Sequence, residues 1–488
     1  MASTTATMSI ARPGLTNSGL KSDCLSFVEV LGQSVAHISP TLTPAVVAPL
    51  VFASAGNGTW FVYLLATVAL ALVGLNINQF ARGSASSGAL YAFIGQGLGP
   101  VYGVLAGWAL VYASVTTAVS VFAGSLNYVQ VLLHQIGVNI SAIIPCVIGV
   151  AIAWWIAFKD VKLSAKVMLT LEFISMGLIA IVSFVVLAKN GFRLDMSQFS
   201  FKGVTPDGIR MGLMLGFFSY VGFESATTLG DEAKEPLKTI PRAVLMSALL
   251  AGLFFMFSSY TQVLGFHGAP LTLDKSDAPY NVICPNAGVG FLAPLISLGA
   301  VISMWACTLA SINAASRIFF AMSRHGLFPS SLGNAHGNNF TPHIAVHICS
   351  VITLVITAVM ILKKVALTDI CGYLGTLSSF GFLVAYIFIC IGAPIALARI
   401  KRLRFWNILI SLVAIVICGA ALVSNIYPVP AAPGNLFPYI FLAYMILGGV
   451  WLLIVRGRYP NIIREIAQDL DLVEEVSRKN SELAATNI

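Results

Sequence analysis

Charged residues are scarce in this chain: they make up 9% of its 488 residues, whereas about 25% is typical of a soluble domain. Hydrophobic residues make up 58%. This composition excludes a chain of soluble domains and predicts an all-α polytopic membrane protein. A helix needs about 20 apolar residues to cross the bilayer core. Twelve stretches meet this requirement, at 26–54, 60–80, 100–126, 140–158, 164–188, 209–229, 241–264, 288–320, 343–362, 367–395, 405–426 and 437–455.

Several chemical motifs are also missing from the sequence. It has no glycine-rich nucleotide-binding loop, so transport driven by ATP is not expected, and gradients or exchange remain as driving forces. The apolar stretches hold no paired His/Asp motif and the chain has no Cys-x-x-Cys, which argues against a membrane-embedded enzyme. We therefore expect no catalytic residues, no cofactor and no metal. Residues 1–23 lack an apolar core, so we expect no cleaved signal peptide.

Basic residues are distributed unevenly between the connecting segments. With both termini in the cytoplasm, the inside segments and helix ends hold 20 lysine and arginine residues, and the outside segments hold the other seven of the 27. Because basic loops stay in the cytoplasm, we expect both termini there and an integral protein of the plasma (cell inner) membrane. The net charge of +8 then reflects this topology and contact with anionic membrane lipids, not binding of nucleic acid.

Two of the apolar stretches contain residues that interrupt a helix. Residues 37–44 read HISPTLTP, and residues 217–225 read FFSYVGFES, about 180 positions further on. Proline lacks an amide proton, and glycine loosens a helix. In hydrocarbon, backbone groups freed in this way are tolerated only against protein or a water-filled cavity. We predict backbone breaks at 38–43 and 219–223 that face each other near mid-membrane, where an inverted-repeat transporter binds its substrate.

Four groups of residues follow one another in an order that is typical of one family of transporters. They are SGALY at 87–91 with Gly99, Gly103 and Gly107-Trp108; the 217–224 stretch with IPRA at 240–243; SRIFFAMSRHGLFP at 316–329; and GTL at 375–377. Together they resemble the signatures of the amino acid–polyamine–organocation family of permeases, across about 300 residues.

This resemblance implies a LeuT-type fold of ten core helices in two inverted five-helix repeats, with helices 1 and 6 broken, plus two peripheral helices. The expected organisation is a cytoplasmic tail at 1–24, the transport core at 25–398, the peripheral helices at 399–457 and a cytoplasmic tail at 458–488. Residues 462–476 could form an amphipathic helix with a regulatory role, although a solvated tail is the simpler interpretation.

The sequence also departs from the family. Many members carry a glycine-rich break in the first span, where this chain has Ser-Pro-Thr-Leu-Thr-Pro. Several proton-linked members and exchangers carry a lysine in the fifth span near the position of Ser175, and this chain has none between Lys166 and Lys189. The coupling ion, proton or sodium, therefore stays open.

The main-chain site of the family implies how a zwitterion would bind here. A half-helix N-terminus offers free N–H groups and partial positive charge, and a half-helix C-terminus offers free carbonyls. A carboxylate would meet the first break, and an ammonium would meet its carbonyls and those of the second. The alternatives are a proline kink with back-bonded hydroxyls, and packing aromatics. The candidate substrate-binding residues are Ile38, Ser39, Thr41, Thr43, Phe218, Ser219, Val221, Thr308 and Ser311, with Tyr112, Thr117, Ser378 and Ser379 as further wall residues.

Three titratable residues are candidates for ion coupling or gating. Glu172 lies within the fifth apolar stretch, where a carboxylate faces a cavity, pairs or takes up a proton, so it is either a proton carrier or a hydrogen-bonding brace. Glu224 occupies the family's Gly-Phe-Glu position, which implies a gate or a proton sensor. His37 titrates near neutral pH but could equally be a locally satisfied histidine. The acidic residues that follow, Asp231, Glu232 and Glu235, are expected to form a solvated cytoplasmic cluster.

These observations favour a secondary active permease that moves an amino acid by alternating access, coupled to protons or working as an exchanger. The nearest alternative is a polyamine or small organic amine as substrate. Such a substrate has no carboxylate and would prefer acidic side chains, of which Glu224 and Glu172 are available. The oligomeric state and the particular substrate are not encoded in any motif.

Overall fold

Helices and the loops that connect them make up the part of the chain that the structure describes. This computed structural model describes residues 24–470 apart from 84–88, 160, 231, 338 and 340. The SGALY motif therefore lies partly outside the described residues, as do the first 23 residues and Asp231. Within the described ranges there is no strand, and extended backbone pairs only at an isolated bridge between Leu25 and Ala233.

The helices follow one another as the apolar pattern predicts. The first part of the chain contains α1 (Phe27–Ile38), η1 (Thr43–Val47), α2 (Ala48–Ala55), η2 (Gly56–Gly58), α3 (Thr59–Ala81), α4 (Ala89–Leu98), α5 (Pro100–Gln135), α6 (Ile143–Lys159) and α7 (Val161–Lys189). The second part contains α8 (Met196–Phe199), α9 (Pro206–Phe218), η3 (Ser225–Leu229), α10 (Pro236–Gly265), η4 (Leu273–Lys275), α11 (Pro279–Asn286), α12 (Leu292–Arg324), η5 (Ser330–Gly333), α13 (His343–Leu362), α14 (Leu367–Arg399), α15 (Phe405–Ser424), η6 (Gly434–Leu436) and α16 (Phe437–Arg458).

One of the predicted helix ends is wrong. The stretch predicted to end at residue 126 continues to Gln135, since hydropathy marks the end of the apolar stretch and not the end of the helix. The connection between α10 and α12 contains a further short helix, α11, which begins at Pro279 and buries Cys284. Proline is well suited to the first helical turn, where its missing N–H has no partner to lose.

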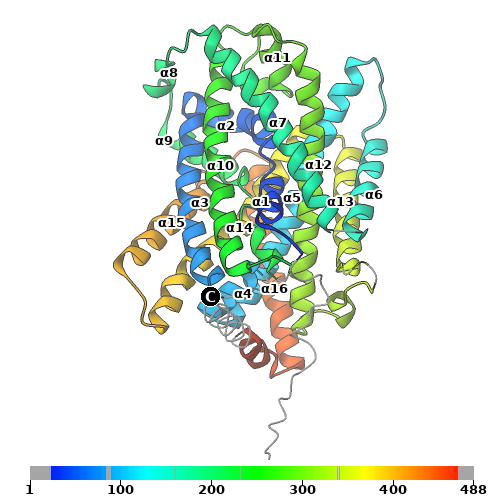
Figure 1. The fold of residues 1–488 in the computed structure, drawn as a ribbon, viewed down its shortest axis with the longest axis vertical. Helices are drawn as coiled ribbons and strands as arrows, with labels where there is room; N and C mark the ends of the chain where they lie inside the picture. Colours follow the sequence, from blue (N-terminus) through cyan, green and yellow to red (C-terminus); the bar gives the residue numbers. More distant parts are fainter. Residues whose placement is uncertain are drawn as a thin grey trace, which may run out of the picture.

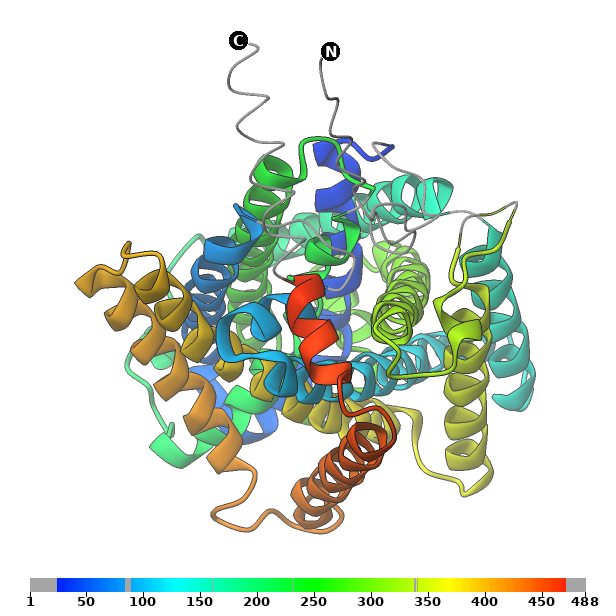
Figure 2. The same ribbon diagram turned by 90° about the horizontal axis from the view of Figure 1, so that it is seen from below.

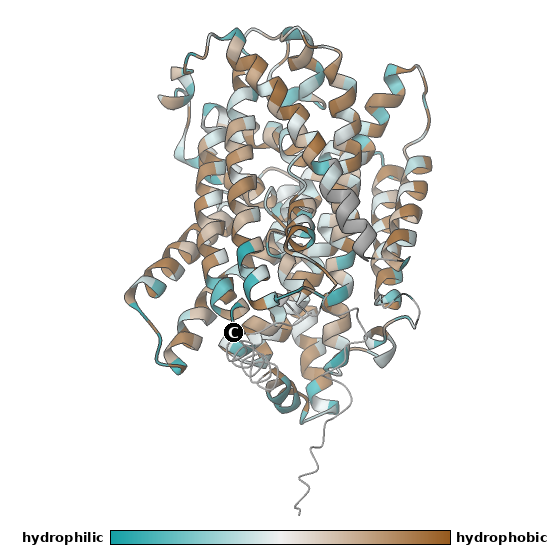
Figure 3. Cartoon of the chain, in the orientation of Figure 1, coloured by the Kyte–Doolittle hydropathy of each residue, from teal (hydrophilic) through white to brown (hydrophobic). Residues whose placement is uncertain are grey.

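The helices make this an integral membrane protein. Among the described residues, nine helical segments are long and apolar enough to cross a membrane, and α6 is a shorter apolar helix. The first of the nine, Phe27–Ala81, is 55 residues long and includes the break between α1 and α2. Figure 3 shows hydrophobic residues along the lengths of the outer helices and hydrophilic ones gathered mainly toward the two ends of the molecule.

The broken first helix lies in the middle of the fold (Figure 1). α1 packs against α7, α10 and α12, while α5 packs against both α12 and α14. The helix α16 is attached to α5 by a reciprocal pair of hydrogen bonds: Trp108 Nε1 donates to the Tyr444 carbonyl at 3.0 Å, and the Tyr444 hydroxyl donates to the Trp108 carbonyl at 3.1 Å. Gly448 makes room for the Trp108 ring, because a Cβ there would overlap it.

The segment after α16 is not a solvated tail as far as residue 470, so that interpretation is wrong for these residues. Residues 462–470 are helical and bury Ile462, Ile466 and Leu470. Figure 2 shows this segment lying across α4. Leu470 rests on Gly95, and Gln96 Nε2 donates to the Leu470 carbonyl at 3.4 Å. The apolar residues of this segment recur with a period of 3.6 residues, which predicts a helix with one apolar face. The sequence pattern does not identify α4 as the element on which this face packs.

Candidate functional site

The first break is present where the prolines predict it. α1 ends at Ile38, and Ser39 adopts a left-handed conformation with φ of 47° and ψ of 70°. Pro40 follows, and helical structure resumes as the π-helical segment η1 at Thr43. Because Pro40 has no N–H to donate, the Ala36 carbonyl accepts the N–H of Ser39 instead, and the regular helical pattern stops there. The predicted break at 38–43 is confirmed.

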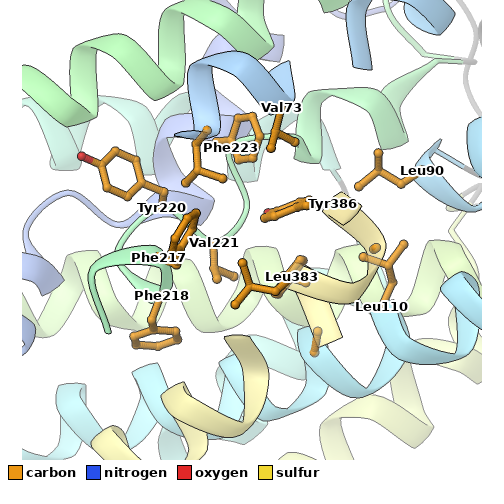
Figure 4. Close-up of a cluster of buried hydrophobic side chains, with 14 of the residues drawn as sticks. Val73, Leu90, Leu110, Phe217, Phe218, Tyr220, Val221, Phe223, Leu383 and Tyr386 are labelled. Carbon is orange, nitrogen blue, oxygen red and sulfur yellow. The ribbon is translucent and has the colours of Figure 1, made fainter. Parts of the chain in front are cut away.

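The second break is also present and lies against the first. α9 ends at Phe218, Gly222 has a φ of 94°, and the chain continues as the 3₁₀ segment η3. Gly222 packs directly on the ring of His37, and a Cβ at this position would overlap that ring. The backbone N–H of Ala226 donates to Ser34 Oγ at 3.0 Å, which joins η3 to α1. The side chains of this break point in several directions, and Phe223 lies beside Tyr386 (Figure 4).

Glu172 holds the first break from the side of α7. Its Oε1 accepts the backbone N–H of Thr41 and the Thr41 hydroxyl, each at 3.0 Å, and the carboxylate is 1% exposed. The next hydroxyl along, that of Ser39, lies 2.8 Å from Ser303 Oγ on α12. Both sides of the break are thus tied to neighbouring helices. The hydrogen-bonding brace, one of the two interpretations open for Glu172, is present in the structure.

The other candidate substrate residues are buried around the two breaks, and several are already hydrogen-bonded. Thr308 and Ser311 donate to carbonyls of their own helix, those of Met304 and Cys307. The Thr43 hydroxyl has no partner among the described protein groups. Ile38, Phe218 and Val221 are buried, and Phe218 packs on Gly375. Ser219 Oγ donates to the Leu215 carbonyl at 3.2 Å. Thr117 Oγ1 lies 2.5 Å from Ser378 Oγ.

Glu224 and His37 line one small cavity between the two breaks. The volume of this cavity is about 20 Å³, and its walls include Ser114 of α5 and Thr228 of η3. The hydroxyl of Tyr386, on α14, donates to Glu224 Oε2 at 2.7 Å. Sequence reasoning did not single out Tyr386, because nothing in its local pattern distinguishes it from other tyrosines in apolar stretches.

Glu232 is not part of a solvated cluster, so that expectation is wrong. Its carboxylate is buried and accepts two hydrogen bonds from Arg317 Nη2, at 3.0 and 2.8 Å. Its backbone carbonyl accepts the N–H groups of Cys24 and Leu25. Arg317 lies within the apolar helix α12, and an arginine in such a place requires a partner, which is the signal that could have identified the pair. Glu235 does pair with Lys238 at the surface, at 3.2 Å.

Two broken helices that face each other are the arrangement by which many membrane transporters bind their substrates. Over residues 38–470, which include both breaks, Glu172 and Glu224, the sequence matches the amino acid permease family. The chain belongs to this family. It is a family of membrane transporters and not of enzymes, and distant similarity to branched-chain amino acid permeases supports the resemblance noted in the sequence.

The relatives of this permease are named for different substrates. It is 25% identical over 349 residues to the branched-chain amino acid permease BcaP of Bacillus subtilis, an alignment covering 67% of this chain and 72% of that protein. It is 25% identical to the methylthioribose transporter of the same organism, over 64% of this chain and 68% of the relative. It is 26% identical to the low-affinity putrescine importer PlaP of Escherichia coli, over 67% and 71%. Family membership therefore identifies the protein as a transporter, and its substrate has to be inferred from the binding site.

Proposed function

We propose that this permease is a secondary active transporter that moves an amino acid across the membrane by alternating access. The observation that carries the proposal is the contact between two broken helices, in which Gly222 packs on the His37 ring and the Ala226 N–H donates to Ser34 Oγ. Buried half-helix ends are the feature by which such transporters bind charged small molecules.

The finer architecture is part of the same proposal. Segment Phe27–Ala81 provides two crossings, the broken stretch from α1 to α2 and the helix α3, because each contains at least the roughly 20 residues needed to cross a bilayer core about 30 Å thick. α6 and the broken α9–η3 stretch provide further crossings, which gives twelve spans in a LeuT-type 5+5 inverted repeat. Residues 25–398 form the transport core, 399–457 the two peripheral helices, and both termini lie in the cytoplasm of a plasma membrane protein.

The carboxylate of the substrate is proposed to bind at Thr41. The backbone N–H of this residue donates to Glu172 Oε1, so it is already occupied by a carboxylate of the protein. Glu172 therefore occupies the position that an amino acid carboxylate would take, and substrate binding exchanges one carboxylate for the other. The ammonium is proposed to meet the carbonyls near His37, Ile38 and Val221, with Phe218 nearby.

Amidation of the carboxylate of a good substrate is expected to weaken its binding by about 2 kcal/mol, or roughly 30-fold, because buried N–H groups lose a charged acceptor. The measurement is competition with labelled substrate for uptake into vesicles that contain the purified permease, using a panel of amino acids and amines. The matched control is the same compound with its ammonium acetylated. Equal transport of an amine that lacks any carboxylate would contradict the amino acid assignment.

That result would favour the second candidate function, transport of a polyamine or small organic amine. The specific observation in its favour is that two carboxylates, Glu172 and Glu224, are buried beside the breaks, each accepting hydrogen bonds from neutral groups. A buried carboxylate is a direct partner for an ammonium that brings no carboxylate of its own.

Uptake is expected to depend on pH and not on sodium. A carboxylate that faces a cavity binds a proton on one side of the membrane and releases it on the other when the surroundings change with the conformation. Glu224→Gln should flatten the pH profile more than Glu172→Gln, because Glu224 adjoins η3 and the cavity, whereas Glu172 braces the break from α7. Uptake measured between about pH 5 and pH 8, with and without sodium, tests this.

The two glutamine variants serve as controls for each other, since both replace a buried carboxylate by its isosteric amide. Strict dependence on sodium at constant pH, with the wild-type pH profile retained in both variants, would show that these glutamates do not carry the coupling ion. In that case the hydroxyls at Thr308 and Ser311 would be the next candidates, as hard oxygen ligands.

A further inference from the structure

His37 is the least satisfied polar side chain near the two breaks. It lies in the last turn of α1, is 1% exposed, and neither Nδ1 nor Nε2 has a hydrogen-bond partner among the described protein groups. A buried imidazole always carries at least one N–H donor, and a neutral one also carries an acceptor. Buried polar groups in folded proteins are nearly always satisfied by protein or by ordered water.

The cavity beside His37 has the size and the walls of a water site. About 20 Å³ is enough for one water molecule and too little for an amino acid. The polar part of its wall comes from Glu224, Ser225, Thr227 and Thr228 around the second break, and from Ser114 on α5. The rest of the wall is apolar, formed by Leu90, Leu110, Ala314, Ile318 and Phe382.

The polar wall can satisfy a water molecule fully. A carboxylate has about four acceptor positions, so the hydrogen bond from Tyr386 to Glu224 Oε2 leaves further capacity. The hydroxyls of Thr227 and Thr228 donate to the carbonyls of Glu224 and Ser225, at 2.7 and 2.8 Å. Their lone pairs remain as acceptors. In Figure 4, Tyr386 lies between the second break and the two leucines of the cavity wall, Leu90 and Leu110.

We propose that a water molecule bound in this cavity links His37 to Glu224, and that this linked pair holds the transported proton as one unit. The inference rests on the proposed proton-coupled function and specifies its site. A proton from the medium converts the neutral imidazole and the carboxylate into an imidazolium and a carboxylate, or an imidazole and a carboxylic acid, joined by the water. Release on the other side returns the pair to its starting charge, so one proton enters and one leaves.

Other titratable groups around the pair do not replace either member. The closest are Tyr386 on α14, which binds Glu224, and Cys307 on α12, whose thiol donates to the His37 carbonyl at 2.8 Å. From α7, Glu172 reaches the far side of the first break and binds Thr41. The charges of Arg317 on α12 and of Glu232 after η3 neutralise each other in a buried ion pair.

The two members of the pair also belong to different broken helices, whose relative position has to change during alternating access. His37 belongs to the first broken helix and Glu224 to the second, and they meet where Gly222 packs on the imidazole. If the two breaks separate during transport, the shared water site opens and the proton is released. The pair is thus a positioning and proton-holding element between the two halves, separate from the Thr41 site proposed for the substrate carboxylate.

Sharing of one proton makes a specific prediction for substitutions in the full-length permease reconstituted in vesicles. His37→Gln and Glu224→Gln should each remove most of the pH dependence of uptake, and the double variant should match either single one, because all three lose the same proton site. A double variant whose pH profile changes by the sum of the two single changes would overturn the proposal. So would a wild-type profile in His37→Gln protein that elutes and melts as the wild type does.

A cavity-filling variant tests the water without touching either titratable residue. Ser114→Val occupies the water site and removes one hydroxyl, so uptake at the optimal pH should fall about tenfold and the pH midpoint should move by about one unit. The matched control is Ser125→Val, a buried serine on the same helix whose hydroxyl binds the Val301 carbonyl away from the cavity. It should keep the wild-type pH profile. Equal behaviour of the two variants would overturn the proposal.

A high-resolution density map provides a readout that does not depend on transport. Density for one water between His37 and Glu224 is expected in sodium-free buffer, and it should be absent in Ser114→Val. No density, or density that appears only with sodium, would overturn the water assignment. Failure of wild-type vesicles to take up any amino acid or amine would contradict the proposed function instead, and the map would still decide the water site.

Discussion

Replacing Arg317 by methionine is expected to destabilise the permease by about 3–5 kcal/mol, because the substitution leaves the Glu232 carboxylate buried without its charged partner. Arg317 is 2% exposed and gives both carboxylate oxygens a hydrogen bond, at 3.0 and 2.8 Å. The carbonyl of Glu232 also holds the start of the described chain at Cys24 and Leu25, so the loss reaches α1. Thermal unfolding of the purified protein in detergent measures the effect.

Two further variants distinguish loss of the pair from loss of a charge. The double variant Arg317→Met with Glu232→Met removes both buried charges and should recover most of the stability. Lys238→Met breaks the exposed pair with Glu235, at 3.2 Å, and should cost less than about 1 kcal/mol. A melting temperature of the Arg317→Met protein equal to that of the wild type would mean that the carboxylate finds another partner or takes up a proton.

Gly222→Ala is expected to cost about 2–5 kcal/mol of stability and to abolish uptake. The backbone at this residue has a φ of 94°, which strains any residue that carries a Cβ, and the added methyl group would overlap the His37 ring. The two breaks would be pushed apart at their point of contact. Thermal unfolding and uptake by reconstituted vesicles, measured on the same preparation, test both effects.

The backbone and steric components of this effect can be separated. Adding His37→Ala to Gly222→Ala removes the overlap and leaves the strained φ, so part of the stability should return while uptake stays low. Gly419→Ala in α15 is the control, since nothing lies within 4 Å of a Cβ built there and alanine favours a helix over glycine. If Gly222→Ala is no more destabilising than Gly419→Ala, the close contact with His37 is not rigid.

The two breaks were predictable because proline and glycine act on their own stretch of backbone. A proline cannot donate a backbone hydrogen bond, so Pro40 interrupts its helix through a local effect. Gly222 is the one residue of its stretch with a positive φ, which glycine adopts without strain. The positions of most apolar helices were equally local properties, since each helix needs its own stretch of about 20 apolar residues to cross the bilayer core.

The partners of the buried polar residues were not predictable in this way. Thr41 and Glu172 are 131 residues apart, Glu224 and Tyr386 are 162 apart, and Glu232 and Arg317 are 85 apart. Each contact depends on how whole helices are placed, and many residues of the same type compete for each role. The sequence indicated that such groups need partners, and only the packing of α1, α7, α12 and α14 decides which ones.

The docking of residues 462–470 on α4 has a consequence for biosynthesis. These residues leave the ribosome about 370 residues after α4. Until then, the surface around Gly95 and Gln96 lacks the Leu470 residue that later covers it. Completion of this face therefore waits until α16 has been synthesised, and a chain terminated before residue 462 would leave the surface at Gly95 uncovered.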